Sequence, residues 1–459
     1  MRIKQISVKG LFRILDHSIP LNQEDRITII HGPNGFGKTT LLRMVNALFN
    51  ARYSELQTIP FRELWVDFDD GSNIQVSKSN KSGKTKKNEN DKNIELIFDF
   101  SKNGLDKSTS FSPKYLKNPT ERRSLLASIE REIPELKRIG SDTWLYIPTR
   151  ELLSLNSILE RFRDLIPTKY FDKTELEWDE SRKSIDVRFI ETQRLLSLGS
   201  IRQPREYIIQ PTLFEFEVDS ERQPPMEWSV TKYSKELGQA INSKLTEYAT
   251  LSQALDRTFP VRLVRQNLAY TLTNDELQNK LASLEEKRSH LMEVGLLDKK
   301  QEAESLLQAT DDNTRNVLSV YVEDVEQKLG VFAEMADKID LLQRIVKERF
   351  KYKQMTISKE KGFIFTTQDN NFLSPTDLSS GEQHELVLLY ELLFKVKPGS
   401  LILIDEPEIS LHVGWQVQFL KDLQEITKLA KFDVIVATHS PDIINNRWDL
   451  TVELKGPDA

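Results

Sequence analysis

Residues 32–39 read Gly-Pro-Asn-Gly-Phe-Gly-Lys-Thr and fit the pattern GxxxxGK[ST]. The apolar segment RITIIH precedes them and an apolar helical pattern follows, which is the strand-to-helix context that this motif needs. Glycines let backbone N–H groups approach phosphate oxygens, and the helix N-terminus adds further donors. We expect Lys38 to reach the β- and γ-phosphates and the Thr39 hydroxyl to bind Mg²⁺. The other loop residues expected to contact nucleotide are Asn34, Gly35, Gly37 and Thr40.

Two adjacent carboxylates, Asp405 and Glu406, follow the apolar run 401–404. Such a run predicts a buried strand, and ligands collect at the carboxyl ends of parallel strands. We expect Asp405 to hold Mg²⁺ through water and Glu406 to activate the attacking water as a general base. Paired with the phosphate-binding loop, the two acids indicate hydrolysis of a nucleoside triphosphate.

A third motif, LSSGEQ at 378–383, precedes a long apolar helical pattern. Ser379 and Glu382 have the spacing of a capping box, so the motif predicts the start of a helix. The first turn of a helix also attracts anions, because its N–H groups point outward along the axis. A contact with phosphate through Ser379 and Gly381 is therefore the second interpretation of the same residues.

The order of these motifs resembles that of the ABC-type ATPases. LSSGE is similar to their LSGGQ signature, EISLH at 408–412 stands in the place of the D-loop, and His439 stands in the place of the switch histidine. The resemblance implies ATP and Mg²⁺ as ligands. It also implies head-to-tail dimers, in which Ser379 and Gly381 of one subunit bind the γ-phosphate held by Lys38 of the other. His439 would contact the γ-phosphate within its own subunit.

Two positions depart from the pattern of transporter ATPases. Ser380 replaces the first signature glycine, and His412 stands where transporters usually carry aspartate. Both departures are more similar to the side of the family that contains the SMC and OLD proteins than to the transporters. Residues 9–13 (KGLFR) also resemble a segment of RecF-like heads whose arginine touches nucleotide, so the resemblance implies a nucleotide contact for Arg13.

The family also has a glutamine that senses Mg²⁺, the Q-loop residue. Two segments compete for this place, YIPTR at 146–150 and FIETQR at 189–194. Only the second contains a glutamine. Gln193 is therefore the expected catalytic and metal-linked glutamine, and an ordinary surface residue is the alternative.

The elements that must position these residues lie at the two ends of the chain. Residues 3–8 and 27–31 are predicted strands, and 39–49 a helix. Near the other end, the sequence predicts helices at 381–396 and 414–430 and strands at 401–404, 433–437 and 450–454. This alternation predicts an α/β fold with a largely parallel sheet. With the resemblance, it predicts an ABC-type ATPase head, a mixed sheet flanked by helices.

About 330 residues separate the two ends. Their sequence patterns predict a β-rich N-terminal lobe and an inserted helical lobe. Residues 61–76 read as a β-hairpin, and the lysine-rich segment 78–93 reads as a flexible loop, with a nucleic-acid or partner contact as the alternative. Apolar residues spaced by three and four between 318 and 346 favour a short antiparallel helical lobe. We therefore expect three regions, 1–228, 229–350 and 351–459.

Composition excludes several classes of protein. The 459 residues are 38% hydrophobic and 29% charged, too apolar for a disordered chain and too polar for a membrane protein. There is no cysteine, which excludes disulfides and Cys-ligated zinc. No apolar run is long enough for a membrane span and no signal core is seen, so the expected location is cytoplasmic. The formal net charge of −6 argues against a surface covered in basic side chains that would bind nucleic acid.

Within the family, the chain resembles the ATPase subunits of two-gene anti-phage systems. It is most similar to the PARIS-type ATPases, with the Septu type next. The PARIS resemblance implies a homo-oligomeric scaffold that holds a separate Toprim-type effector nuclease inactive until a phage protein is sensed. The 20 residues after His439 leave no room for a fused nuclease, so we expect a partner chain. The alternative is a RecF-like repair ATPase whose closed dimer clamps DNA; direct binding of nucleic acid is left open.

Overall fold

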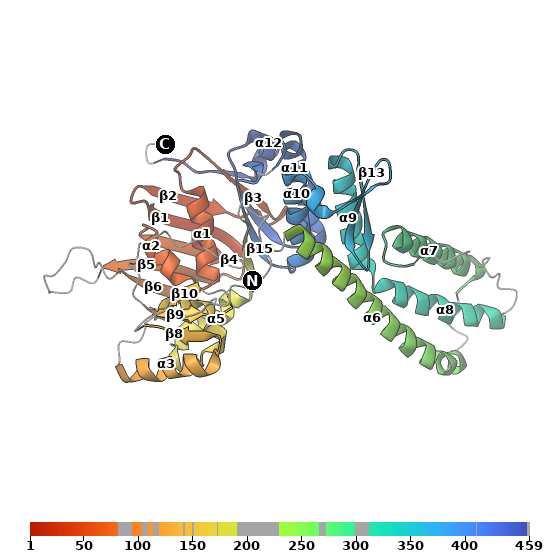
Figure 1. The fold of residues 1–459 in the computed structure, drawn as a ribbon, viewed down its shortest axis with the longest axis horizontal. Helices are drawn as coiled ribbons and strands as arrows, with labels where there is room; N and C mark the ends of the chain where they lie inside the picture. Colours follow the sequence, from red (N-terminus) through yellow and green to blue (C-terminus); the bar gives the residue numbers. More distant parts are fainter. Residues whose placement is uncertain are drawn as a thin grey trace, which may run out of the picture. The chain divides into compact units, whose positions relative to one another are not determined.

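The computed structural model describes residues 1–80, 94–102, 109–112, 119–140, 143–148, 151–171, 173–190, 229–265, 272–298, 312–409 and 411–456 (Figure 1). These residues divide into two compact units. The first unit contains the described residues up to 190 and those from 396 onward, and the second unit contains those from 229 to 395. No helix in the described part of the chain is both long enough and apolar enough to cross a membrane.

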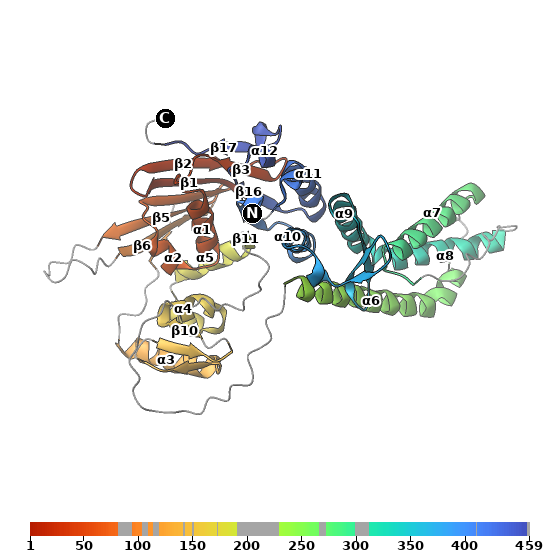
Figure 2. The same cartoon turned by 45° about the horizontal axis from the view of Figure 1, so that its top comes forward.

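A five-stranded parallel sheet forms the centre of the first unit. Its order is β11–β15–β16–β3–β17, and every neighbouring pair is parallel. Figure 2 shows β17, β3 and β16 side by side. The strands are β3 (Ile27–His31), β11 (Val187–Ile190), β15 (Leu401–Asp405), β16 (Asp433–Ala437) and β17 (Thr451–Glu453). Strands from the two ends of the chain thus join in one sheet, as the alternation predicts.

Helices of the first unit connect its strands and pack on its sheets. They include α1 (Lys38–Phe49), α2 (Tyr53–Thr58), α5 (Lys173–Lys183), α11 (Val413–Ala430) and α12 (Pro441–Ile444). Helix α1 is buried on most of its sides, because one hydrophobic core joins its apolar residues to both the parallel sheet and a second, antiparallel sheet. Burial of this kind fixes the helix that begins at the phosphate-binding loop.

The antiparallel sheet is the predicted β-rich lobe. It has six strands in the order β2–β1–β4–β5–β6–β7. They are β1 (Ile3–Leu11), β2 (Leu15–Pro20), β4 (Glu63–Phe68), β5 (Asn73–Asn80), β6 (Ile94–Ser101) and β7 (Thr109–Phe111). The expected hairpin is confirmed as β4 and β5, and Asp70 closes its turn by accepting the Ser72 N–H. Most of the expected flexible loop, residues 81–93, lies outside the described residues. Parallel and antiparallel strands therefore occupy separate sheets of an α/β fold.

A small α/β layer follows, which the sequence did not single out. It consists of α3 (Pro119–Glu132), β8 (Leu136–Arg138), β9 (Thr143–Tyr146), β10 (Glu151–Ser154) and α4 (Leu155–Arg161). The buried Trp144 lies in its own hydrophobic core. Short 3₁₀ turns lie at Arg163–Leu165, Thr168–Tyr170, Pro375–Asp377, Pro407–Ile409 and Trp448–Leu450.

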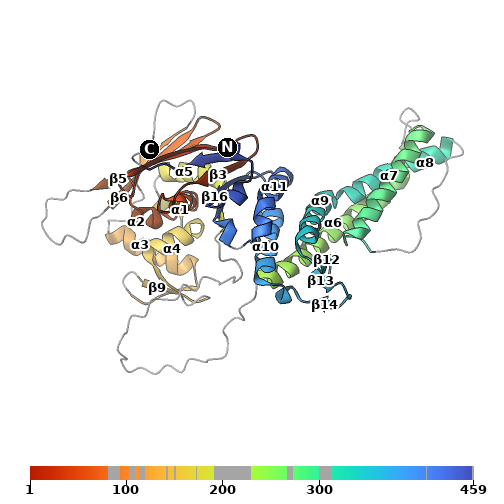
Figure 3. The same cartoon turned by 90° about the horizontal axis from the view of Figure 1, so that it is seen from above.

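The second unit is mainly helical. Its helices are α6 (Ser229–Arg265), α7 (Asn274–Glu293), α8 (Asp312–Gly330), α9 (Ala333–Arg349) and α10 (Ser380–Tyr390), the last continued by a π-helical turn, Glu391–Lys395. Figure 3 shows α6, α7 and α8 running alongside one another. A small antiparallel sheet is made of β12 (Lys353–Ser358), β13 (Gly362–Thr367) and β14 (Phe372–Leu373). Gly362 has φ +68°, and a Cβ there would lie 1.8 Å from the Ser234 carbonyl oxygen of α6, so only glycine fits.

The apolar spacing between 318 and 346 correctly predicts burial, but the pattern is divided between two helices. Helix α8 ends at Gly330 and α9 begins at Ala333, so the pattern runs over two helices joined by a short turn. The buried members of the pattern are Leu318, Val322, Val325, Leu329, Phe332, Ala336, Ile339 and Val346.

The contacts divide the chain at a different place from the expected boundary at 350. Residues 351–395 group with the helical lobe, because α10 is joined to α9 by the buried Arg349–Glu385 ion pair. Ser234 of α6 also accepts the Phe363 N–H. The LSSGEQ helix therefore belongs to the second unit, and the acidic strand β15 belongs to the first.

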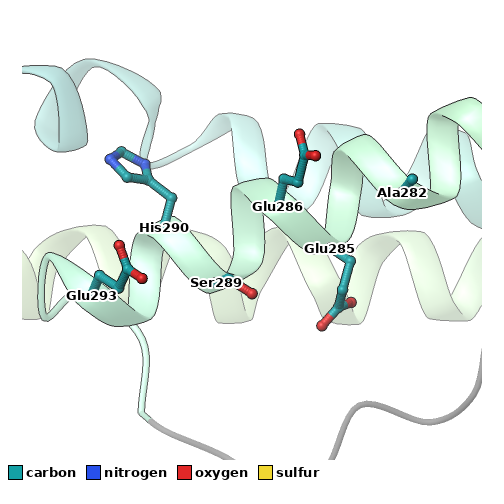
Figure 4. Close-up of a pocket in the computed structure, with 6 residues that line it drawn as sticks. All are labelled: Ala282, Glu285, Glu286, Ser289, His290 and Glu293. Carbon is teal, nitrogen blue, oxygen red and sulfur yellow. The ribbon is translucent and has the colours of Figure 1, made fainter.

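A surface groove of about 480 Å³ lies along α7 (Figure 4). Its lining comes from one helix, and three of the six residues are acidic: Ala282, Glu285, Glu286, Ser289, His290 and Glu293. His290 Nε2 lies 2.6 Å from the Asp340 carboxylate of α9. None of the expected nucleotide-binding residues lines this groove.

Candidate functional site

The loop between β3 and α1 has the backbone of a phosphate-binding loop. Gly32, Gly35 and Gly37 have φ of +149°, +87° and +86°. At Gly37 the positive φ would strain any residue with a Cβ, and that Cβ would lie 2.6 Å from the Leu11 side chain, so the backbone and the packing against β1 both favour glycine. Gly37 also occupies the N-cap of α1, where no side chain caps the helix. The first N–H groups of α1 are thus left for an anion, and the loop fits a phosphate group.

Lys38 lies folded back over this loop. Its Nζ donates to the carbonyl oxygens of Gly32 at 2.8 Å and Pro33 at 3.2 Å, and it lies 3.3 Å from His439 Nδ1. Burial lowers the pKa of the ammonium, and the negative charges of Glu406 and Asp405 oppose that shift. The cation is therefore already in place where the sequence expects the phosphates.

The two expected metal ligands meet directly. Thr39 Oγ1 donates to Asp405 Oδ1 at 3.0 Å, which joins the start of α1 to the end of β15. Burial raises the pKa of the Asp405 carboxyl, and the Thr39 hydrogen bond opposes this shift. Among the described residues, no cluster of three acidic, histidine or cysteine side chains could hold a metal. One hydroxyl and one carboxylate fit Mg²⁺, which commonly takes few protein ligands and completes its shell with phosphate and water.

Glu406 has a strained backbone. Its φ is +43°, a conformation that costs a residue with a Cβ roughly 1–3 kcal/mol. Its N–H donates to the Ala437 carbonyl of β16 at 2.8 Å, and its Oε1 lies 3.7 Å from His439 Nε2. The carboxylate is about 30% exposed, so water can reach it. Strained residues that are held in place cluster at functional sites, which favours a chemical role for Glu406.

The structure therefore gathers five of the expected residues at the carboxyl edge of the parallel sheet: Lys38, Thr39, Asp405, Glu406 and His439. Asn34 and Gly35 lie exposed at the tip of the loop, and Thr40 is half-buried in the first turn of α1. Arg13 is exposed in the β1–β2 turn, beside Leu11 and Phe12, which pack against Gly37. Phe12 is a neighbour of the loop that sequence reasoning missed.

Gln193 lies outside the described residues. The strand that leads toward it, β11, pairs in parallel with β15, with Ile190 opposite Ile404. The competing segment begins in β9, which belongs to the separate three-stranded sheet. The expectation for Gln193 thus remains a prediction.

The LSSGEQ motif starts α10 in the second unit. The expected capping box is present, since Ser379 accepts the Glu382 N–H and Glu382 accepts both the N–H and the hydroxyl of Ser379. Lys353 Nζ donates to the same Glu382 oxygen at 2.5 Å. Burial of Glu382 disfavours its charge, but these bonds prevail and lower its pKa. Ser379 is exposed and Gly381 half-buried, so the helix start remains accessible.

His17 of β2 is a further residue that the motifs did not reveal. It is buried, and its Nε2 lies 2.9 Å from the Phe36 carbonyl oxygen of the phosphate-binding loop. Because a carbonyl only accepts, Nε2 must carry the proton. The alternation in LDHSIP, with Leu15, His17 and Ile19 buried, is the sequence signal that places His17 on the inner face.

We predict that replacing His17 with glutamine weakens the pH dependence of stability. Burial lowers the pKa of His17, so the folded chain keeps the ring neutral while the unfolded chain takes up a proton below about pH 6.5. Stability is therefore lost as the pH falls through that range. Urea unfolding at pH 7.5 and 5.5 measures the loss, which His17→Gln should reduce. The exposed His412→Asn, which preserves an N-cap, should behave as the native chain; an unchanged slope in His17→Gln would contradict the assignment.

A match to a known protein family identifies the chain as an ATPase. The sequence profile of the AAA ATPase domain family matches residues 1–444. No curated protein matches the chain. Among solved structures, similar chains include an SMC head domain from Thermotoga maritima, with 12% identity, 97% of this chain and 91% of that chain covered, and a TM-score of 0.31. Another is the Smc head domain with an extended coiled coil, bound to the C-terminal domain of ScpA, from Pyrococcus furiosus, with 11% identity, 99% and 94% covered, and a TM-score of 0.33. Since the family profile matches nearly the whole length, the chain belongs to the AAA ATPase domain family.

Proposed function

We propose that this ATPase hydrolyses ATP by the ABC-type reaction and acts as the ATP-dependent scaffold of a two-component anti-phage system. The observation that carries the catalytic part is the joining of Thr39 to Asp405, beside Lys38, Glu406 and His439. This arrangement offers a cation for phosphate, oxygen ligands for a metal and a water-accessible carboxylate in one place.

Each side chain has a distinct role in this proposal. Lys38 binds the β- and γ-phosphates, and Thr39 and Asp405 hold Mg²⁺, which neutralises phosphate charge when it is bound. Glu406 accepts a proton from the attacking water. His439 contacts the γ-phosphate and keeps Glu406 oriented through the 3.7 Å approach of its Nε2. Gln193 contributes to the same metal site.

The α10 start of one copy completes the site of a second copy. Ser379 and Gly381 are accessible at a helix N-terminus, where an anion is favoured. Glu382 is neutralised by Lys353, which reduces the repulsion that a nearby phosphate would feel. ATP thus joins two copies head to tail, and hydrolysis separates them.

The motif resemblance supports the defence role. In this proposal the closed cytoplasmic oligomer, of the PARIS type, holds a separate Toprim-type nuclease inactive, and a phage protein triggers its release. The helical lobe formed by α6 to α9 provides a surface for such protein contacts. Direct binding of nucleic acid is no part of the proposal.

Copurification from cells that carry the native operon tests the proposal. With ATP present, we expect a nuclease encoded beside this chain to copurify with the tagged protein, and Lys38→Ala to lose it. Phage infection of the same cells should release the nuclease from the native complex. Copurification of replication or recombination proteins, without a nuclease, would overturn the defence role and leave the ATPase assignment intact.

A further inference from the structure

Two side chains connect the loop after β15 to the loop after β16. Glu408 Oε1 accepts the backbone N–H of His439 at 2.8 Å. Gln416 Nε2 donates to the Glu408 carbonyl at 3.2 Å and to the Leu411 carbonyl at 3.4 Å. Gln416 Oε1 accepts the Ser440 hydroxyl at 2.9 Å. The loop that carries the switch histidine is thus hydrogen-bonded at two consecutive residues, His439 and Ser440, to residues following the acidic strand.

The orientation of the Gln416 amide follows from its partners. The two backbone carbonyls can only accept, so the NH₂ group must face them. The amide oxygen is then left for the Ser440 hydroxyl, which can donate. A single side chain therefore satisfies groups from both loops, and no residue without both a donor and an acceptor could replace it.

The fold explains why Gln416 can reach both loops. Helix α11 begins after its N-cap His412 and connects β15 to β16, and Gln416 lies in its first turn. The two strands are adjacent and parallel, with Asp405 opposite Ala437. Their carboxyl ends, and the loops that follow, therefore lie beside the start of α11.

The position of the His439 ring depends on these contacts. Its Nδ1 lies 3.3 Å from Lys38 Nζ and its Nε2 lies 3.7 Å from Glu406 Oε1. The preceding residue is fixed by the bond from the Thr438 N–H to the Ile30 carbonyl at 3.1 Å. Beyond it, the His439 N–H donates to Glu408 and the Ser440 hydroxyl donates to Gln416, while the Ser440 N–H donates to Thr438 Oγ1 at 3.0 Å.

We propose that Glu408 and Gln416 are positioning residues for His439 in the hydrolysis of ATP. Glu408 acts through the backbone N–H of His439, and Gln416 acts through the hydroxyl of the adjacent Ser440. This inference rests on the proposed catalytic site. It also means that displacement of the loop after β15, which carries the 65% exposed Ile409, moves the switch histidine.

Substitution of Gln416 by glutamate tests the positioning role of Gln416. A carboxylate still accepts from Ser440 but cannot donate to the two carbonyls, so the loop after β15 is released. We expect kcat to fall about 10- to 100-fold, because misplacing a catalytic group by an ångström has an effect of that order. KM and the affinity for a fluorescent ATP analogue should stay within a few-fold of native. Gln418→Glu makes the same change at an exposed position of α11 and should leave kcat native.

Two variants of Glu408 test the positioning role of Glu408. Glu408→Gln keeps an oxygen that accepts the His439 N–H and should retain most of the native kcat, whereas Glu408→Ala should lose activity to the same degree as Gln416→Glu. If the glutamine variant is as poor as the alanine variant, the charge of Glu408 matters rather than its bond, and the proposal fails. Should Gln416→Glu not fold, Ser440→Ala removes the opposite end of the same contact and is expected to lower kcat without changing affinity.

Glu406→Gln in the same assay distinguishes a failure of the proposed catalytic site from a failure of the positioning role. If it hydrolyses ATP at the native rate, the proposed catalytic site is wrong. If it is inactive while Gln416→Glu and Glu408→Ala turn over like the native protein, the site stands and the positioning role is overturned. A loss of ATP affinity equal to the loss of kcat would also overturn it, because that result would indicate a binding role.

Discussion

Replacing Glu406 with glutamine is expected to slow ATP hydrolysis about 100-fold or more while leaving ATP affinity within a few-fold of native. A positioned general base contributes about 10²- to 10⁴-fold, and an amide cannot take a proton from water. In this variant Lys38 keeps its hydrogen bond to the Gly32 carbonyl and Thr39 keeps its hydrogen bond to Asp405, since neither bond involves the Glu406 carboxylate. Phosphate release under saturating ATP measures the rate, and equilibrium binding of labelled ATP measures the affinity.

A matched variant makes this result specific. Glu453→Gln makes the same change at an exposed position of β17 in the same unit, and its rate should be native. Since hydrolysis is blocked, the Glu406→Gln protein should also accumulate in its ATP-bound oligomer, visible as a larger mass on addition of ATP. Native hydrolysis by Glu406→Gln would show that another group activates the water.

Local sequence signals predicted the parts of the site that are built from consecutive residues. The loop glycines, α1 and the acidic end of β15 each follow from a short pattern and were found where expected. The capping box of Ser379 and Glu382 was predicted for the same reason. In such cases the physical cause acts between residues a few positions apart. It is the close approach of loop backbone to a phosphate, or the capping of a helix by a nearby side chain.

Contacts between distant residues were not predictable in this way. The bonds from His17 to Phe36 and from Glu408 to His439 exist only because the sheets bring separate loops together. The membership of α10 in the second unit likewise comes from contacts with residues distant in the sequence, among them the buried Arg349–Glu385 pair. The break between α8 and α9 was only partly predictable from the sequence. Gly330 within the apolar pattern is a local signal for a break, but packing decides whether a helix ends there.

Mixing two inactive variants is expected to restore ATP hydrolysis if the site is shared between copies. Lys38→Ala removes the cation of the phosphate-binding loop, and Ser379→Arg places a bulky side chain at the start of α10. Each variant alone should be inactive, and Ser379→Arg should still bind ATP, since Ser379 lies outside the unit that holds the loop. Loss of the N-cap costs about 1 kcal/mol, so α10 should remain folded.

In a head-to-tail dimer of one Lys38→Ala and one Ser379→Arg chain, one site carries both defects and the other carries none. With free exchange, half of the dimers are mixed, so activity should recover to roughly a quarter of native. A chain that carries both substitutions, mixed with Lys38→Ala, leaves every site defective and should show no recovery. Exchange is verified separately by energy transfer between labelled copies. If labelled copies exchange and the mixture stays inactive, the start of α10 does not complete a site in trans, and the hydrolytic machinery must be contained within a single chain.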